Sequence, residues 1–205
     1  MLFRSIGRLV FDDKGGVTGV SSADLDGYFL GNPVTGSYTF NTDCSLTFQL
    51  QDTSGAFQHF AGKAAPYGAR VEVHQTDSDT GERGVLEKAV TGCQTGSLHG
   101  DYKFALSGTA SQFATLQEPG SAVSIAGTLS ADGAGNLVFV SDGGKTTGSY
   151  QADSDCIVEM ELGVAQGNSA AIVKLRGVLV NGGKLLLAAE SDPAAIATAR
   201  LTAKP

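Results

Sequence analysis

The segment at residues 69–75, ARVEVHQ, holds the clearest candidates for chemistry, because charged and apolar residues alternate along it. In an extended strand, Arg70, Glu72 and His74 share one face and the apolar residues share the other. If the charged face lines a polar cavity, Glu72 and His74 can transfer protons while Arg70 stabilises an oxyanion. If the apolar face points inward, all three lie on an outer wall, and the alternation leaves both arrangements open. A similar pattern, which we expect to pair across two strands on an outer wall, is formed by Glu159, Glu161, Lys174 and Arg176.

Aromatic residues are concentrated in the first half of the chain, which makes that half the candidate for a ligand pocket. The ligand-binding candidates are Tyr28, Phe48, Phe57, Phe60 and Arg70. His59 and Tyr67 have no polar aromatic counterpart in the second half, so we expect them, with Tyr28, to orient a ligand. The catalytic candidates are His59, Tyr67, Glu72 and His74. Core filling is the alternative explanation for the aromatic residues.

Several kinds of chemistry lack their motif in this sequence. It contains no Gly-x-Ser-x-Gly elbow, no P-loop, no dinucleotide fingerprint and no His or Cys pair at zinc spacing. The Asp- and Gly-rich segments 12–16 and 132–136 lack the oxygen ligands of a calcium loop, so we expect hairpin turns there. The sequence therefore predicts no metal and no cofactor.

An internal duplication defines the elements that position these residues. Residues 36–44, GSYTFNTDC, return as residues 148–156, GSYQADSDC. Two further matches extend the repeat on both sides: residues 7–12 with 127–132, and residues 71–77 with 186–192. The chain is therefore expected to contain two repeats, residues 1–92 and residues 93–205.

The pattern of apolar runs and turn residues predicts seven strands in the first repeat and eight in the second. The first set is expected near residues 5–11, 17–24, 36–40, 45–51, 57–63, 69–75 and 84–89. The second set is expected near residues 98–106, 123–130, 136–141, 145–151, 156–162, 171–180, 184–190 and 197–203. Residues 29–34 are expected to be a loop insertion. The first repeat thus shows no counterpart of the opening strand of the second: either the repeat has lost that strand or the given sequence begins after it.

We expect an all-β protein built from internally duplicated, antiparallel up-and-down β-barrels. Eight such strands can close a barrel and remove the exposed sheet edges, and its interior is filled by side chains or holds one small ligand. A seven-stranded repeat leaves a gap, so we expect it to borrow an edge from its neighbour or to pack against it. One larger barrel or sandwich using both repeats is the alternative. Residues 185–189 are apolar on both faces, which predicts cover by the other repeat or by a second chain and so allows a homodimer.

The second repeat resembles a bacterial all-β tandem-repeat family whose members are mostly uncharacterised. The resemblance rests on L-x-G-x-Y-x-F from Leu98, G-x-L-x-x-D-G-x-G-N from Gly127, G-x-Y from Gly148, and Asp155-Cys156. It covers nearly all of residues 97–205 and, more faintly, residues 3–89. The general architecture is similar to that of calycin and allene oxide cyclase barrels, which bind hydrophobic molecules or cyclise them without a cofactor.

Charge and hydropathy exclude some partners. The net charge of -7 argues against a nucleic-acid surface, which needs a basic stripe. No apolar run is long enough for a membrane span, and the N-terminal residues lack the apolar run of a signal peptide. As given, the chain is expected to be cytoplasmic, or secreted if a signal peptide has been removed.

Cys44 and Cys156 occupy the same place in the two repeats, and we expect each to be a small buried hydrophobic residue rather than half of a disulfide. Cys93, between the repeats, is expected to be the exposed thiol.

These features lead to one leading functional hypothesis and two alternatives. The leading one is binding of a hydrophobic small molecule inside a β-barrel, with the pocket in the first repeat. The first alternative is a cofactor-independent cyclase or isomerase, similar to an allene oxide cyclase or a Diels-Alderase, acting on a polyene or polyketide-type substrate. The second is a structural or surface repeat protein without a pocket. Whether the protein is an enzyme stays open.

Overall fold

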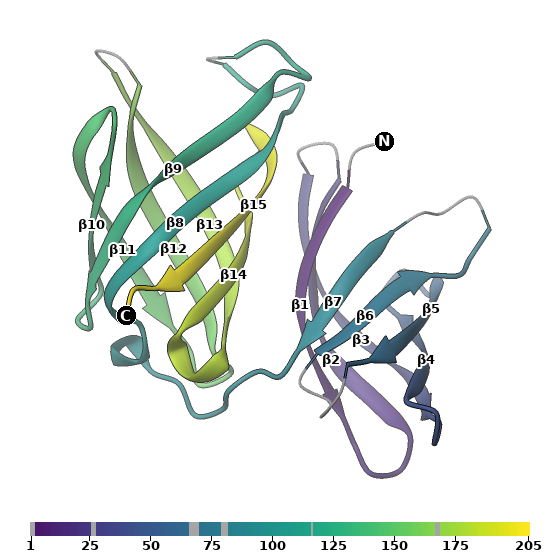
Figure 1. Cartoon of the computed structure of the whole chain (residues 1–205). Coiled ribbons are helices and arrows are strands. Elements are labelled where there is room, and N and C mark those ends of the chain that lie inside the picture. The colour runs from purple at the N-terminus through teal and green to yellow at the C-terminus, as the bar shows by residue number, and fades with distance from the viewer. Residues whose placement is uncertain (1–2, 26–27, 66–69, 79–81, 116, 167–168) are drawn as a thin grey trace. The chain divides into compact units, whose positions relative to one another are not determined.

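The computed structural model describes residues 3–25, 28–65, 70–78, 82–115, 117–166 and 169–205 (Figure 1). For a few strand-end residues it describes the backbone alone: residues 3, 4, 24, 25, 28, 29, 166, 169 and 170. Within these ranges the protein is all-β, and its helical elements are short 3₁₀ turns. This confirms the fold class expected from the sequence.

The first repeat forms an antiparallel sheet in which each strand pairs with the next one along the chain, in the order β1 to β7. The strands are β1 (Phe3–Phe11), β2 (Gly16–Leu25), β3 (Tyr28–Phe40), β4 (Ser45–Gln51), β5 (Phe57–Ala64), β6 (Arg70–Gln75) and β7 (Arg83–Glu87). The sheet is not closed, because β1 and β7 lie at its two edges. The gap expected for a seven-stranded repeat is therefore present.

The second repeat forms a closed eight-stranded antiparallel barrel. Its strands are β8 (His99–Ala110), β9 (Ala122–Asp132), β10 (Asn136–Ser141), β11 (Gly144–Ala152), β12 (Ile157–Gln166), β13 (Ser169–Val180), β14 (Leu185–Glu190) and β15 (Ala195–Ala203). The 3₁₀ turns η2 (Thr95–Ser97) and η3 (Asn181–Gly183) precede β8 and β14. Strand β8 closes the barrel by pairing with β9 on one side and β15 on the other.

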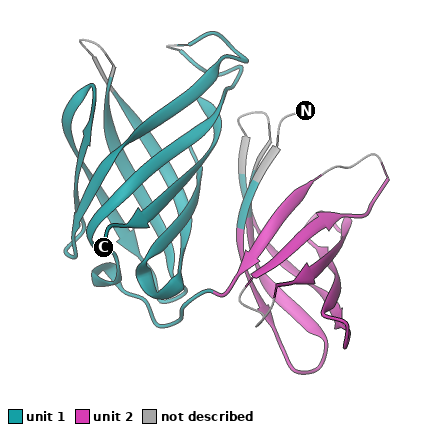
Figure 2. Ribbon diagram, in the orientation of Figure 1, with its two compact units in different colours: residues 1–6, 22–30, 89–205 teal, residues 7–21, 31–88 magenta. Residues whose placement is uncertain are grey.

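Contacts divide the chain into two compact units (Figure 2). The barrel unit, teal in the figure, comprises Met1–Ile6, Ser22–Leu30 and Ala89–Pro205. The sheet unit, magenta, comprises Gly7–Ser21 and Gly31–Lys88. The two repeats build separate sheets, so the alternative of one large barrel using both repeats is wrong.

The Asp- and Gly-rich segments are hairpin turns in both repeats. Asp12 Oδ1 accepts the backbone N–H groups of Lys14 and Gly16, at 2.8 and 2.7 Å. Asp132 Oδ1 accepts the corresponding N–H groups of residues 134 and 136, at 2.7 and 3.0 Å. Gly15 and Gly135 follow with φ values of +87° and +102°, which an L side chain rarely adopts. The carboxylates thus hold backbone turns, as the sequence predicted.

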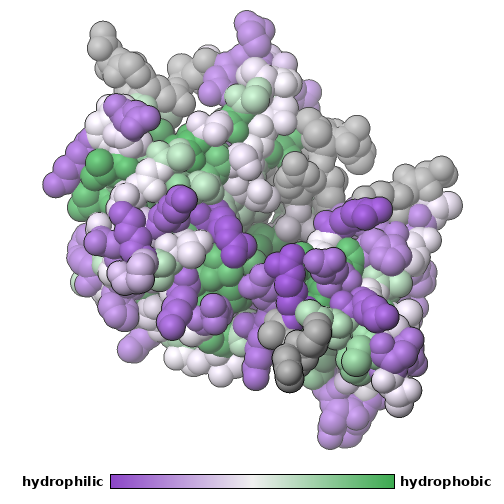
Figure 3. Space-filling view, viewed as in Figure 1, coloured by the Kyte–Doolittle hydropathy of each residue, from purple (hydrophilic) through white to green (hydrophobic). Residues whose placement is uncertain are grey.

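The barrel interior is filled by side chains at alternate positions. Along β8 the inward residues Tyr102, Phe104 and Leu106 are each at most 2% exposed, whereas the residues between them are exposed. The Phe104 and Phe139 rings meet edge to face, with centroids 5.2 Å apart. Polar residues cover much of the molecular face seen in Figure 3. The large apolar side chains of β8 therefore face the barrel interior.

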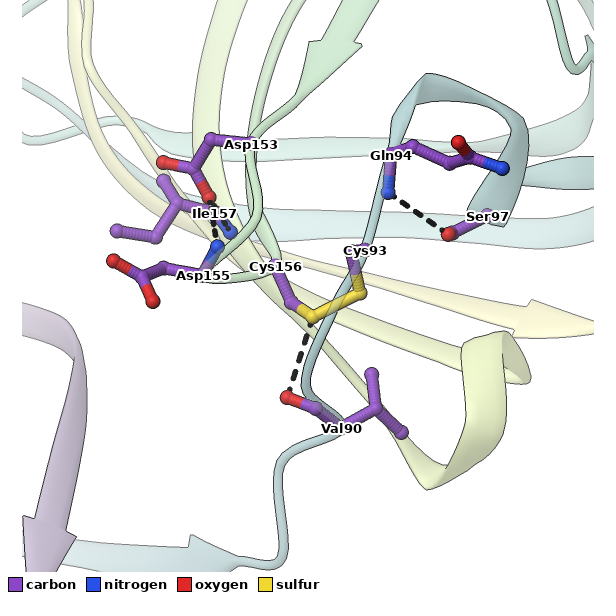
Figure 4. Close-up of a disulfide and its surroundings, with 8 residues drawn as sticks. All are labelled: Val90, Cys93, Gln94, Ser97, Asp153, Asp155, Cys156 and Ile157. Carbon is purple, nitrogen blue, oxygen red and sulfur yellow. Dashed lines mark hydrogen bonds between the residues drawn. A yellow bond between two sulfur atoms is a disulfide. The ribbon is translucent and has the colours of Figure 1, made fainter.

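The disulfide bond joins Cys93, in the segment before β8, to Cys156, in the turn between β11 and β12 (Figure 4). Cys156 is fully buried, and its Sγ lies 3.2 Å from the carbonyl oxygen of Val90. Cys44 is exposed and free. Cys156 is thus buried as expected, but the sequence-based assignment is wrong in leaving it unpaired, in burying Cys44 and in making Cys93 a free thiol, because pairing depends on which cysteines fold close together.

Two other expectations about single segments have clear outcomes. Residues 29–34 are not a loop insertion, because they form part of the long strand β3. In β14, Leu185 and Leu186 are both buried, as are Ala188 and Ala189, so both faces of this strand are buried as predicted.

Candidate functional site

The charged residues of β6 lie on the exposed face of the sheet unit. Val73 is buried and Val71 packs against the same apolar cluster, whereas Arg70, Glu72 and His74 are exposed. The Arg70 guanidinium lies 3.6 Å from the Glu72 carboxylate and 3.5 Å from that of Glu87. The outer-wall arrangement is therefore correct, and the placement of these three residues in a polar cavity is wrong. The apolar set faces inward because it is the set that can join the core.

Strand β5 divides its candidate residues between the two faces of the sheet. Phe60 lies opposite Phe48 of β4 and stacks on it, with ring centroids 4.8 Å apart. Phe57 and His59 lie on the exposed face, where their ring centroids are 6.4 Å apart. Phe60 is three positions after Phe57 in the strand, an odd spacing, so the two side chains point to opposite faces.

His59 is held by Asp77 on the exposed face. Asp77 accepts the backbone N–H of His59 at 2.7 Å and lies 2.7 Å from ring atom Nδ1, while Gln75 Nε2 donates to it at 3.1 Å. These hydrogen bonds, with that from the His59 backbone the strongest cause, lower the pKa of the Asp77 carboxyl from 3.8 to about 2. An ionised Asp77 fixes a proton on Nδ1 and leaves Nε2 as the basic nitrogen.

The His59 and Asp77 pair has the orientation of a catalytic dyad but not its surroundings. The His59 side chain is 50% exposed, so nothing excludes water from a reaction at Nε2. Asp77 is not among the candidate residues that the sequence suggested. The signal that could have found it is its match with Asp192, whose Oδ1 accepts the N–H of Ala194 after β14. Both carboxylates hold the chain where it leaves equivalent strands.

The inner face of the sheet unit is an aromatic surface. Phe48 is 5% exposed, and its ring lies 6.1 Å from that of Phe11, which meets Tyr38 edge to face at 5.1 Å. Leu9 of β1 and Leu86 of β7 pack against the same cluster, so the sheet curls and both edges turn toward one interior. We call this surface the inner aromatic face, defined by Phe11, Tyr38, Phe48 and Phe60.

The predicted site residues do not converge on one place. Phe48 and Phe60 lie on the inner aromatic face. The exposed face carries Phe57, His59, Arg70, Glu72 and His74. Tyr67 and the side chain of Tyr28 lie outside the described residues.

A depression of about 550 Å³ lies on the outer wall of the barrel, over β11, β12 and β13. It contains two ion pairs between neighbouring strands, one of Arg176 with Glu159 and one of Lys174 with Glu161 at 3.2 Å. The cross-strand pairing expected for these residues is confirmed. The charged residues that line the depression are these four, and each is already engaged in an ion pair with its neighbour across the strands.

Glu190 is the charged residue that sequence reasoning missed. It ends β14, on the face that carries the buried residues Leu186 and Ala188, and it is 4% exposed. The sequence signal for this burial is that residue 190 shares one face of the strand with the apolar residues 186 and 188. Gln75 occupies the matching position in the sheet unit.

Comparison with known protein families, with curated proteins and with solved structures finds no match for this chain. Within the described ranges, no three His, Cys, Asp or Glu side chains are grouped closely enough to hold a metal ion. The same ranges contain no helix long and apolar enough to cross a membrane. Membership of the tandem-repeat family stays a prediction.

Proposed function

We propose that the protein binds an apolar small molecule against the inner aromatic face of its sheet unit. The observation that carries the proposal is that this curled sheet is not closed, although its inner face is aromatic. Phe11 and Phe60 are only half-buried, so part of the aromatic surface remains accessible to a ligand. Apolar contact would supply the affinity, because each aromatic ring offers a large surface to cover.

The barrel unit supports a different role, that of a rigid scaffold. Its interior is occupied by fully buried side chains, the largest of which are Tyr102, Phe104 and Phe139. A ligand inside the barrel would have to displace them, at the cost of a densely packed core. The proposal therefore places the ligand in the first repeat, as the aromatic asymmetry of the sequence suggested.

Binding is favoured over catalysis by the positions of the proton-transfer candidates. His59, Glu72 and His74 lie on the exposed face of the sheet, opposite the inner aromatic face. A substrate on the inner face would not contact them, and general acid catalysis requires hydrogen-bond distance to the reacting atom. The cyclase hypothesis therefore receives no support from these residues.

The Cys93–Cys156 disulfide supports an oxidising location for the protein. Disulfides persist in secreted and periplasmic proteins and are rare in the reducing cytosol. The secreted form is thus favoured over the cytoplasmic one.

The first test is native mass spectrometry of the purified protein, followed by denaturing extraction of any retained molecule. Incubation with a panel of fatty acids and polyenes then gives affinities for the wild type and two matched variants. Phe60→Ala removes a ring from the inner aromatic face, whereas Phe57→Ala removes an exposed ring from the opposite face of the same strand.

We expect Phe60→Ala to weaken binding by about tenfold or more, the loss typical of a buried aromatic contact, and Phe57→Ala to leave affinity unchanged. Phe60→Leu keeps most of the buried volume and guards against a simple loss of folding. Equal effects of Phe60→Ala and Phe57→Ala, or no mass gain with any member of the panel, would overturn the proposal.

A further inference from the structure

The strand missing from the sheet unit has a known counterpart in the barrel. The matching residues of the two repeats make β1 equivalent to β9, and β6 and β7 equivalent to β14 and β15. In the barrel, β8 fills the space between β15 and β9 and pairs with both. In the sheet unit, the equivalent space lies between β7 and β1, and no strand of the described chain fills it.

The two edges of this gap are prepared for pairing. An edge strand presents unpaired N–H and C=O groups that pair readily with another chain. Strand β1 has nine residues, FRSIGRLVF, and none is a proline that would block pairing. Leu9 and Leu86 point from the two edges toward the same core, so an inserted strand would be covered on one face.

The cysteines provide a second, independent observation. Cys156 of the barrel is bonded to Cys93, which lies five residues before Leu98 at the entry to β8. Cys44 has the same backbone conformation as Cys156, with φ values of +65° and +63°, yet it is exposed and free. The equivalent of Cys93 would belong to the segment that leads into the missing strand.

The tyrosines of the two repeats support the same interpretation. The Tyr150 hydroxyl donates to the carbonyl oxygen of Leu98, at the entry to β8, at 2.5 Å. Its counterpart Tyr38 donates instead to the backbone carbonyl of Asp12, within its own sheet. The hydroxyl that holds the opening strand in the barrel thus has a local partner in the sheet unit.

We propose that the sheet unit is an acceptor for an eighth strand, supplied by a polypeptide segment with the β8 pattern. The segment is extended, carries large apolar residues at alternate positions, and pairs with β1 and β7. A cysteine at the position equivalent to Cys93, five residues before the equivalent of Leu98, would lie next to Cys44. This is strand addition to open sheet edges, in which backbone hydrogen bonds give affinity and alternate side chains give specificity. The inference does not depend on small-molecule binding.

The test uses the full chain and a synthetic peptide with the sequence of residues 93–110, in which the cysteine is replaced by serine. The control peptide carries serine in place of the inward residues Tyr102, Phe104 and Leu106. We expect the first peptide to bind and the control to bind about a hundredfold more weakly or worse, because three large apolar contacts are lost. Equal binding by both peptides, or binding by neither, would overturn the proposal.

Hydrogen–deuterium exchange shows where the peptide binds. We expect new protection at Gly7–Phe11 of β1 and at β7, with the barrel amides unchanged. Protection changes in β9 and β15 instead would mean that the peptide exchanges with β8 of the barrel, which contradicts the proposal. The two proposals can fail separately: the protein can bind the peptide and none of the small molecules, or the small molecules and not the peptide.

The cysteine arrangement is tested by thiol–disulfide exchange. The peptide cysteine, restored and carried as a mixed disulfide with 2-nitro-5-thiobenzoate, is attacked by the Cys44 thiolate. The new S–S bond joins Cys44 to the peptide, and the coloured thiolate leaves with the electron pair of the broken bond. We expect this reaction to be about tenfold or more faster than with the activated control peptide, because binding raises the effective concentration of the sulfur. Equal rates would contradict the proposed register, and Cys44→Ser should abolish colour release but retain binding.

Discussion

The Cys93–Cys156 disulfide should contribute strongly to the stability of the barrel unit. It closes a loop over a sequence separation of 63 residues. In the chain-entropy model, a loop of that length restricts the unfolded chain enough to stabilise the folded state by about 4 kcal/mol. Cys93→Ala should therefore lower the free energy of unfolding of the barrel by about that amount, and its melting temperature by roughly 15 °C.

The assay measures hydrogen exchange of the backbone amides at increasing urea concentrations, which reports the unfolding of each unit separately. Amides of β8 to β15 should lose protection at lower urea in the variant, while those of β3 to β7 act as an internal reference. Cys44→Ser is the matched control, because Cys44 is exposed and forms no bond. Chemical reduction of the wild type should reproduce the effect of Cys93→Ala.

Two results would refute the reasoning about the disulfide. The first is an unchanged unfolding midpoint for the barrel amides in Cys93→Ala. The second is an equal shift in Cys44→Ser, which would mean that the loss comes from replacing any cysteine and not from opening the loop.

Two further perturbations test the packing and electrostatics of single residues. Because the folded pKa of Asp77 is about 2 and its ordinary value is 3.8, its stabilising effect is complete above about pH 4 and is lost as the pH falls toward 2. Asp77→Asn should flatten this part of the acid-unfolding profile, measured by circular dichroism, and an unchanged profile in that variant would contradict the assignment. A Cβ at Gly127 would lie 2.7 Å from a ring carbon of Phe139, so Gly127→Ala should destabilise the barrel by about 1–3 kcal/mol. Gly96→Ala, whose Cβ would meet nothing closer than 3.5 Å, should leave the urea midpoint nearly unchanged; equal midpoints for both variants would contradict the packing argument.

The order of the strands follows from local features of the sequence. Turn residues such as Asp12 and Asp132 act on the backbone within a few residues, so their positions mark the hairpins directly. The duplication carried the same information twice, and the absence of a first-repeat partner for residues 98–106 predicted the seven-stranded sheet. Segment 29–34 was missed because its strand pattern is interrupted by Pro33, which sheets tolerate only in restricted positions.

The candidate site was less predictable, because it depends on which face of each strand is inside. A period of two residues separates Arg70, Glu72 and His74 from the valines between them, but both sets are consistent with that period. The choice is made when β6 pairs with its neighbours and the valines join the cluster around Phe48. Aromatic composition grouped Phe57 and Phe60 as ligand-binding candidates, whereas the two-residue period of a strand places their side chains on opposite faces.

The sequence alone therefore determined the all-β class, the two repeats, the strand order and the seven strands of the first repeat, because each depends on residues close together in the chain. The tertiary structure decided the inward face of β5 and β6, the closure of one repeat, and the pairing of Cys93 with Cys156 in place of two buried thiols. These depend on curvature and on contacts between residues far apart in sequence, which no local pattern specifies.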